Sequence, residues 1–358
     1  MLRVSRSGAG GSLDHPGVLA ALPRYVDIVQ GKKYPKYMIA QSLPVDFSRR
    51  NTPEELWSIH DSQLEGFQEY EKGVKRKPKR AERNLLELKI LLAHQLMLSC
   101  GFCERKCAVD RLHGDKGYCR AGRNFSLFSA FPHMGEEPEL VPSGTIFTGG
   151  CSIRCIHCQN WDISQWQNNG DSLTPEMMAL QVDSLTEKGC RNINMVGGDP
   201  TPYVWHWLEA MNHVKRPIAT VWNSNSYYSL ETAKLLAGFI DLYLLDFKYG
   251  NNKCAEEISD APGYWEAATR NHLYAKKYGE LIIRVLVLPG HNQCCTKPIL
   301  QWIHDNLRPM TRVNLMFQYR PEWRANERTE LARRLTNPEI SEARAFAEDI
   351  GLKNLVRE

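Results

Sequence analysis

The sequence has no long run of apolar residues and no large excess of charge of one sign. No stretch of 18 consecutive apolar residues occurs, so we expect no transmembrane helix and no membrane partner. Lysine and arginine number 45 against 41 aspartate and glutamate residues, a net charge of +4, which does not favour nucleic acid as a partner. The segment 1–11 lacks the apolar core of a signal peptide. We therefore expect a cytoplasmic protein.

Cysteine, in contrast, is abundant for a protein expected in the cytoplasm. Eleven cysteines occur in the chain, and seven of them fall in two groups. Because the cytoplasm keeps thiols reduced, these groups indicate metal ligands or free thiols rather than disulfides. The first group is Cys100, Cys103, Cys107 and Cys119, and the second is Cys151, Cys155 and Cys158. Both groups are candidate metal sites.

The second group has the spacing C-x3-C-x2-C and follows a short apolar run, 145–147. Three thiolates hold three irons of a cubane cluster and leave the fourth iron for a substrate or cofactor, whereas a structural cluster normally takes four cysteines. Three buried or zinc-binding cysteines are the alternative, since short cysteine motifs have a high false-positive rate. The spacing resembles that of the radical S-adenosylmethionine (SAM) enzymes, which implies that Cys151, Cys155 and Cys158 ligate a [4Fe-4S] cluster.

The first group begins with C-x2-C and places four cysteines within twenty residues. Four thiolates can close a tetrahedral site, which suits zinc or iron, and a second iron–sulfur cluster is the competing interpretation. Because protein ligands would fill every position, we expect a structural or electron-relaying metal. Reduced thiols without a metal are the remaining alternative. We interpret the other cysteines as packing thiols, with the pair Cys294 and Cys295 as a weaker candidate for contact with substrate; they are Cys190, Cys254, Cys294 and Cys295.

From residue 144 onwards, apolar β-branched runs alternate with helical patterns. This alternation predicts a parallel sheet with right-handed crossovers and strands buried on both faces. Six units are too few for a closed eight-stranded barrel. We therefore predict an α/β protein with a partial (β/α)6 TIM-like barrel; a doubly wound open sheet is the alternative. The predicted strands are 144–148, 192–196, 218–222, 240–247, 281–288 and 312–318, and the predicted helices are 175–188, 203–213, 229–237, 264–278, 297–306 and 338–350.

Before the barrel we predict an N-terminal helical and cysteine-rich extension. Residues 1–50 contain scattered glycine and proline and are interpreted as an extended arm with local structure. Thr52 followed by Pro53 has the pattern of a helix start, and helices are expected to about residue 72 and over 81–98. The expected domains are 1–99 for the arm and helices, 100–143 for the four-cysteine metal-binding segment, 144–325 for the barrel and 326–358 for a C-terminal helical segment.

Polar residues and glycines follow the predicted strands. In parallel α/β barrels the catalytic and binding residues lie at the carboxyl ends of the strands. Glycines allow close backbone approach, an acid neutralises an ammonium group, and a lysine balances a carboxylate. The joint placement of these residue types predicts a cofactor site at one end of the sheet. The residues are Gly197, Gly198, Asp199, Asn223, Ser224, Asp246, Lys248, Arg284 and Arg320.

Residues from about 95 to 320 are similar to the group of radical SAM proteins related to pyruvate formate-lyase activating enzyme, and most similar to its uncharacterised bacterial and archaeal members with an extra N-terminal cysteine cluster. The similarity implies that Asp246 and Lys248 contact SAM and that Arg284 matches an arginine of the family. It is carried by Cys100-x2-Cys103-x3-Cys107, Gly117-Tyr-Cys119, Glu136-Glu-Pro138, Ser143-Gly-Thr-Ile-Phe147, Cys158-Gln-Asn160, Asn192-Ile-Asn194, Asp246-Phe-Lys248-Tyr249 and Val287-Leu-Pro-Gly290.

The sequence departs from the pattern of that family at three places. The family's Gly-Gly-Glu is Gly197-Gly198-Asp199 here. Where the family has Asp-Thr-Asn, which helps to bind a monovalent cation near SAM, this sequence has Asn223-Ser224-Asn225. Where the family has a histidine near the sixth strand, this sequence has Arg320. Asn223 therefore replaces the carboxylate that the family has at this cation site.

The resemblance implies a radical SAM enzyme that cleaves SAM reductively at the [4Fe-4S] cluster. The resulting 5′-deoxyadenosyl radical would abstract hydrogen from a peptide or protein substrate, as activating enzymes do. We expect an anaerobic, activase-like oxidoreductase with flavodoxin or ferredoxin as its reducing partner, and no catalytic residue beyond the cluster. A radical SAM enzyme acting on a small molecule and a non-catalytic iron–sulfur sensor or assembly protein are the alternatives.

Overall fold

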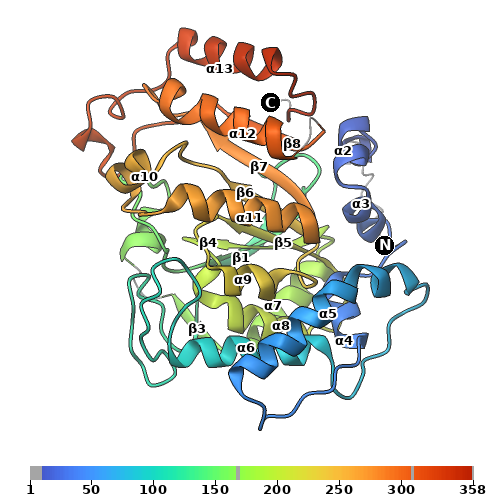
Figure 1. The fold of residues 1–358 in the computed structure, drawn as a ribbon. Helices are drawn as coiled ribbons and strands as arrows, with labels where there is room; N and C mark the ends of the chain where they lie inside the picture. The colour runs from blue at the N-terminus through green and yellow to red at the C-terminus, as the bar shows by residue number, and fades with distance from the viewer. Residues whose placement is uncertain (1–9, 167–169, 308–309, 357–358) are drawn as a thin grey trace.

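The computed structural model describes residues 10–166, 170–307 and 310–356, with one eight-stranded sheet at its centre (Figure 1). The strand order is β3-β1-β2-β4-β5-β6-β7-β8. From β2 to β8 the neighbours pair in parallel, and their order follows the chain. A doubly wound sheet would reverse direction; this one does not, so the partial barrel is confirmed. The six parallel strands are β2 (Ser143–Thr148), β4 (Asn192–Gly197), β5 (Ala219–Ser224), β6 (Leu242–Asp246), β7 (Glu280–Leu286) and β8 (Arg312–Met316).

Two antiparallel strands at one edge of the sheet were absent from the predicted set. Strand β1 (Phe125–His133) pairs with β2, and the short β3 (Asp171–Leu173) pairs with the start of β1. Pro132 argues against a strand in the sequence, because proline cannot donate to the ladder. Strand β3 pairs only with residues 125–127, so the part of β1 that contains Pro132 lies at the edge of the sheet, where proline is tolerated. The segment 100–143 therefore carries part of the sheet as well as its four cysteines.

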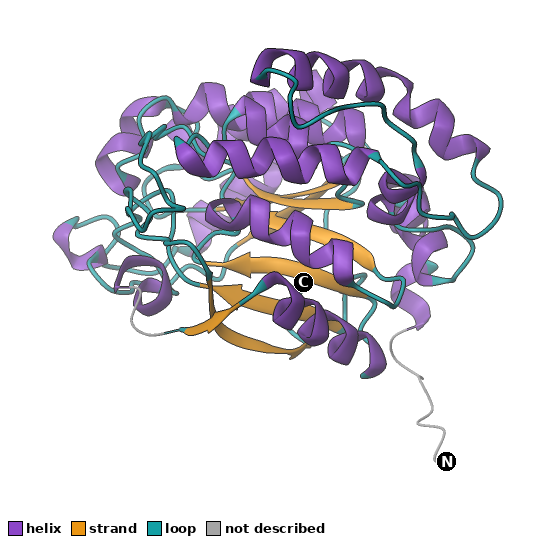
Figure 2. Ribbon diagram, turned by 90° about the horizontal axis from the view of Figure 1, so that it is seen from below, coloured by secondary structure: helices purple, strands orange, loops and turns teal. Residues whose placement is uncertain are grey.

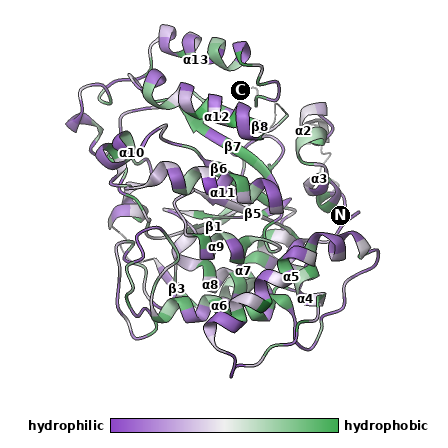
Figure 3. Ribbon diagram, viewed as in Figure 1, coloured by the Kyte–Doolittle hydropathy of each residue, from purple (hydrophilic) through white to green (hydrophobic). Residues whose placement is uncertain are grey.

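Helices cover the outer face of the sheet, and two more helices pack outside them (Figures 1 and 2). Helix α6 packs against α8, and α5 packs against α6. Helix α5 starts with a capping box between Thr52 and Glu55, as its sequence predicted. The sheet strands are largely apolar and the outermost helix, α13, is largely polar (Figure 3). No helix within the described ranges combines the length and the apolar character needed to cross a membrane. These helices are α5 (Pro53–Gly73), α6 (Leu85–Leu98), α7 (Pro175–Glu187), α8 (Val204–His213), α9 (Leu230–Leu236), α10 (Asn252–Ser259), α11 (Tyr264–Tyr278), α12 (Lys297–Leu307) and α13 (Asn337–Asp349).

The N-terminal region is helical where the structure describes it, and the expected extended arm is corrected. Its helices are α1 (Gly10–Leu13), α2 (Pro16–Ala21), α3 (Pro23–Val29) and α4 (Lys36–Ser42). Val18 and Tyr25 pack on the inner face of the sheet, in a cluster that includes Leu244 of β6. The backbone N–H of Arg24 donates to Glu280, the first residue of β7 (2.6 Å). These helices therefore close the amino-terminal end of the half-barrel. They were missed because helices of four to seven residues are too short to show a period and depend on packing.

Candidate active site

A cavity of about 460 Å³ opens at the carboxyl ends of the parallel strands. This volume lies within the range of pockets that bind cofactor-sized ligands. All six parallel strands contribute residues to the cavity, as the sequence predicted. The cavity therefore lies at the carboxyl end of the sheet, where parallel α/β barrels have their catalytic and binding residues. Each strand contributes at least one lining residue; in the order β2, β4, β5, β6, β7 and β8 these are Phe147, Val196, Asn223, Asp246, Leu286 and Met316.

The cysteine loop after β2 lies against this cavity, and Cys151, Cys155 and Cys158 all line it. Two backbone hydrogen bonds hold the loop to the end of helix α10: Arg154 N donates to Ser259 O (2.7 Å), and Ile156 N donates to Ile258 O (3.0 Å). Helix α10 therefore fixes the cysteines relative to the sheet.

Polar groups surround the three sulfurs. The Asn225 side-chain amide donates to Cys151 Sγ (3.4 Å), and the Ser164 hydroxyl lies 3.1 Å from Cys158 Sγ. Burial raises the pKa of Cys155 above its usual value, and the nearby Lys248 ammonium offsets this shift only in part. Hydrogen bonds and a cation both stabilise thiolates, which are the form that ligates metals.

The number of thiolates in the loop suits a cubane cluster. Among the described residues that line the cavity, Cys151, Cys155 and Cys158 are the cysteines, so the loop offers three thiolates to a metal. Three thiolates hold three irons of a cubane and leave the fourth iron without a protein ligand, whereas a structural zinc site takes four protein ligands.

The glycine pair after β4 is required by the backbone that leads into the cysteine loop. Gly197 has φ +144°, and a Cβ there would lie 2.0 Å from the Thr148 carbonyl oxygen. A Cβ on Gly198 would lie 2.2 Å from the carbonyl oxygen of Gly150. Both glycines line the cavity as expected. Their first role in this structure is to let β4 and the cysteine loop lie against each other.

Asp199, which we expected to contact the cofactor, is not among the lining residues. Its carboxylate accepts hydrogen bonds from Ser224 Oγ (3.0 Å) and from the backbone N–H groups of Asn225 (2.8 Å) and Thr201 (2.9 Å). Burial raises the pKa of Asp199, although these donors oppose the shift. Asp199 therefore holds the carboxyl end of β5 and the residue after it in place. The last residue of β5, Ser224, lines the cavity.

Asp246 and Lys248 lie together at the cavity wall, as the sequence predicted. Lys248 Nζ donates to Asp246 Oδ2 at 2.7 Å, and the Lys248 backbone N–H donates to the Tyr264 hydroxyl at 3.0 Å. Burial lowers the pKa of Lys248, but Asp246 and the Cys155 thiolate outweigh it and raise the pKa above its usual value. Lys248 therefore remains an ammonium group beside the cysteine loop. Its contact with SAM stays a prediction.

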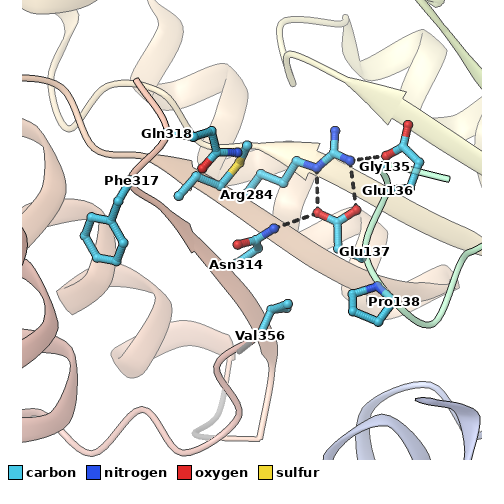
Figure 4. Close-up of a pocket in the computed structure, with 10 residues that line it drawn as sticks. Gly135, Glu136, Glu137, Pro138, Arg284, Asn314, Phe317, Gln318 and Val356 are labelled. Atoms are coloured by element: carbon cyan, nitrogen blue, oxygen red, sulfur yellow. Dashed lines mark hydrogen bonds and ion pairs between the residues drawn. The ribbon is translucent and has the colours of Figure 1, made fainter. Parts of the chain in front are cut away.

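Arg284 lines the cavity but is already paired with two glutamates (Figure 4). Its guanidinium donates to both carboxylate oxygens of Glu137 (2.7 and 2.8 Å) and forms an ion pair with Glu136. Asn314 also donates to Glu137 (2.9 Å), and Arg284 donates to Asn223 Oδ1 (3.3 Å). Burial lowers the pKa of Arg284, but the carboxylates outweigh it and raise the pKa beyond its usual value. No role was predicted for this glutamate pair from the sequence.

Arg320 lies away from the cavity. Its side chain is 54% exposed, and its guanidinium lies 3.5 Å from Glu322. Gln318, two residues earlier, lines the cavity instead. Strand β8 ends at Met316, so the chain has left the sheet before it reaches Arg320. Arg320 is not among the residues that line the cavity, so its contact with the cofactor stays a prediction that the lining does not support.

The four-cysteine segment gathers its thiols next to the cysteine loop. Burial and the neighbouring thiols raise the pKa of Cys103; these neighbours are Cys119, Cys100 and Cys107. Gly117 is needed at this site, because a Cβ there would lie 2.9 Å from Cys107 Sγ.

Tyr118 links this segment to the cysteine loop. The Arg105 guanidinium stacks on its ring at 3.8 Å and the Arg154 guanidinium at 4.3 Å. Arg105 also donates to the Ser152 carbonyl oxygen (3.1 Å). The two cysteine groups are thus connected through aromatic and cationic side chains.

A third group of metal-ligand side chains was not foreseen as a site. Cys254, His291, Cys294 and Cys295 bring their ligand atoms within 4.8 Å of one another. From the sequence, the three cysteines were interpreted as packing thiols, with Cys294 and Cys295 as a weaker candidate for contact with substrate. The only signal in the sequence was His291 three residues before Cys294 and next to a strand end.

Comparisons with known proteins find a family model and two relatives similar to this chain. A family model described as the radical SAM superfamily matches residues 145–303. The uncharacterised protein MJ0674 of Methanocaldococcus jannaschii is 39% identical over 337 residues, which cover 92% of this chain and 98% of that protein. The uncharacterised protein MJ0808 of the same organism is 25% identical over 252 residues, which cover 64% of this chain and 72% of that protein.

Two solved structures show a more distant likeness. A domain of pyruvate-formate lyase-activating enzyme from Bacteroides vulgatus has a TM-score of 0.32 at 14% identity and covers 50% of this chain and 88% of that chain. SuiB of Streptococcus suis bound to the precursor peptide SuiA has a TM-score of 0.44 at 13% identity and covers 85% of this chain and 62% of that chain. Likeness at this level does not bear on the substrate.

Proposed function

The chain belongs to the radical SAM superfamily, and on this premise we propose that it is an activase-like enzyme that abstracts hydrogen from a peptide or protein substrate. The observation that carries the proposal is the cavity wall. Cys151, Cys155 and Cys158 border the same space as Asp246 and Lys248, and they are the only cysteines among the described residues that line it. Three thiolates beside an open cavity leave room for a cofactor at the metal.

The donor set fits the group that the superfamily uses. The three cysteines would hold a [4Fe-4S] cluster, and the cluster and SAM, when bound, supply radical hydrogen abstraction. Lys248 offers a fixed ammonium group to a carboxylate, and Asp246 orients that ammonium group. Phe147, Leu286 and Met316 add apolar side chains to a wall that is otherwise largely polar.

The open side of the half-barrel supports a large substrate. A second cavity of about 520 Å³ adjoins the first and extends between the edge strand β8 and the loop after β1. The two cavities share Glu136, Arg284 and Gln318. The C-terminal segment pairs with β8 at Val313, so the route that we propose for a polypeptide segment runs along the carboxyl end of β8, beyond that pairing, where the two cavities share their lining. The small-molecule alternative predicts that a metabolite, and not a protein, increases the rate of SAM cleavage.

We also propose a second iron–sulfur cluster at Cys100, Cys103, Cys107 and Cys119, which would relay electrons from flavodoxin or ferredoxin. The support is the ligand set: Cys119, Cys100 and Cys107 lie close enough to Cys103 to raise its pKa, and four cysteines are the usual ligands of a [4Fe-4S] cluster. The link through Arg105, Tyr118 and Arg154 places this group beside the reactive loop. Two cubanes would give about eight irons per chain, whereas about four would contradict the second cluster. The proposed location is the cytoplasm, where thiols stay reduced.

The experiment that tests the reaction uses anaerobically reconstituted protein, SAM and a chemical reductant. Release of 5′-deoxyadenosine and methionine is expected. Candidate protein partners carrying deuterium should then transfer it into 5′-deoxyadenosine. If protein with a fully loaded cluster cleaves no SAM, the sensor or assembly alternative is correct.

A further inference from the structure

Four side chains outside the active site form a compact set of soft metal ligands, the Cys254 cluster: Cys254, His291, Cys294 and Cys295. All four ligand atoms lie within 4.8 Å of one another. Cys254 Sγ lies 3.8 Å from Cys294 Sγ. His291 Nδ1 lies 3.3 Å from Cys294 Sγ, 3.8 Å from Cys254 Sγ and 4.0 Å from Cys295 Sγ.

These separations are those of ligands around one tetrahedral ion. Zinc–sulfur bonds of about 2.3 Å and a zinc–nitrogen bond of about 2.0 Å give sulfur–sulfur separations of roughly 3.8 Å and sulfur–nitrogen separations of roughly 3.6 Å. A disulfide between Cys254 and Cys294 would instead need their sulfurs at about 2.05 Å and would leave Cys295 and His291 unused.

The fold brings the ligands together from two neighbouring loops. Cys254 lies in the first turn of α10, after β6, whereas His291 follows the turn after β7. Cys294 and Cys295 lie in a π-helix, Asn292–Thr296, a conformation that is frequent at functional sites. Gly250 permits the approach of the two loops, because a Cβ there would lie 2.7 Å from the Cys294 carbonyl oxygen.

The surroundings complete the arrangement of a metal site. His291 turns Nδ1 towards the sulfurs, while its Nε2 lies 3.7 Å from a carboxylate oxygen of Glu330. Glu330 is itself held by Arg328 at 2.6 Å. Metal-bound histidines usually have such a carboxylate at the other ring nitrogen. The Asn251 side-chain amide donates to Cys254 Sγ (3.4 Å), which stabilises a thiolate.

We propose that the Cys254 cluster binds one zinc ion with four protein ligands. Three sulfurs and one imidazole suit zinc, and a fully occupied ligand set is typical of a structural site. The ion would tie the start of α10 to the loop after β7. The other end of α10 accepts the backbone hydrogen bonds of Arg154 and Ile156 in the cysteine loop. The zinc thereby stabilises the helix that supports the reactive cysteines. This proposal holds whether or not SAM is cleaved.

The experiment is metal analysis of the full-length protein, with variants that assign the zinc. We expect one zinc per chain to be lost in Cys254→Ser and in Cys294→Ser and kept in His291→Cys, which restores a fourth ligand. The control is Cys190→Ser, since Cys190 is a buried thiol in none of the three groups. Zinc that is unchanged in Cys254→Ser and Cys294→Ser would overturn the proposal.

A second measurement on the wild-type protein avoids any dependence on the folding of variants. X-ray absorption at the zinc edge should show both sulfur at about 2.3 Å and nitrogen at about 2.0 Å. A shell of sulfur alone would assign the zinc to the four-cysteine segment and overturn the proposal. Alkylation and mass spectrometry of anaerobically purified protein would detect a disulfide between Cys254 and Cys294. Such a disulfide would also overturn the proposal.

Discussion

The cysteine loop after β2 and the Cys254 cluster have similar local chemistry and differ in what lies beside them. Each receives an asparagine amide hydrogen bond of 3.4 Å on a sulfur, from Asn225 in the loop and from Asn251 in the cluster. The loop sulfurs border a cavity of about 460 Å³, whereas no residue of the Cys254 cluster lines that cavity and its four ligand atoms lie within 4.8 Å of one another. The number of protein ligands and the adjoining space, rather than the residue type, therefore separate a reactive metal centre from a structural one.

The strongest test of this contrast removes a ligand from the reactive loop. Cys155→Ala leaves two sulfurs, too few to hold the cubane, so SAM cleavage should fall to the background rate. The Cys254 cluster does not use this residue, so zinc should remain at one per chain. Both are measured on one anaerobic preparation, by 5′-deoxyadenosine release and by metal analysis. Joint loss of iron and zinc would show that the two sites are not independent.

The next largest effect is expected at Lys248. Lys248→Met removes an ammonium group that we expect to pair with the carboxylate of SAM, and a hydrogen bond between charged groups is worth about 1.5–3 kcal/mol. The Kd for SAM should therefore rise about 10- to 100-fold while the iron content stays unchanged, as equilibrium binding to the reconstituted protein would show. Lys248→Arg keeps the charge and should lose less. An unchanged Kd in Lys248→Met would place the SAM carboxylate elsewhere.

Removal of zinc from the Cys254 cluster should mainly lower stability. At a free zinc concentration a hundredfold above Kd, binding contributes about 2.7 kcal/mol, which corresponds to roughly 4 °C in the unfolding temperature of a chain of this length. Cys294→Ser should lose this increment, and zinc addition should no longer raise its unfolding temperature. SAM cleavage should decrease only severalfold, because the reactive ligands are retained. Complete loss of cleavage in a folded Cys294→Ser protein would contradict a purely structural role.

The smallest effects are expected from the two matched amides. Asn225→Ser removes the donor to Cys151 Sγ, and Asn251→Ser removes the donor to Cys254 Sγ while its hydroxyl can still cap α10. One hydrogen bond is worth about 0.5–1.5 kcal/mol, or about a 2- to 10-fold change. Asn225→Ser should make the potential of the reactive cluster more negative, because hydrogen bonds to sulfur raise it. Asn251→Ser should weaken zinc affinity alone. Redox titration measures the potential of the reactive cluster, and competition with a zinc chelator measures the zinc affinity. The assignment would be contradicted if Asn225→Ser weakened the zinc affinity and Asn251→Ser changed the potential.

The sequence predicted the features that depend on short spacings. The three reactive cysteines lie within eight residues, and each parallel strand is one apolar run, so both could be recognised locally. The Cys254 cluster could not, because Cys254 and His291 are 37 residues apart and meet only when the loops after β6 and β7 pack together. Asp199 and Arg320 were assigned by matching a motif. The direction of each side chain depends on where its strand ends, which the sequence does not show.

The most direct test of the central claim is electron–nuclear double resonance on the reduced cluster with SAM labelled by 15N at its amino group and 17O at its carboxylate. A cluster held by Cys151, Cys155 and Cys158 leaves one iron for these groups, so hyperfine coupling from both labels is predicted. Absence of coupling while SAM is bound would show that the fourth iron has another ligand and would contradict the account.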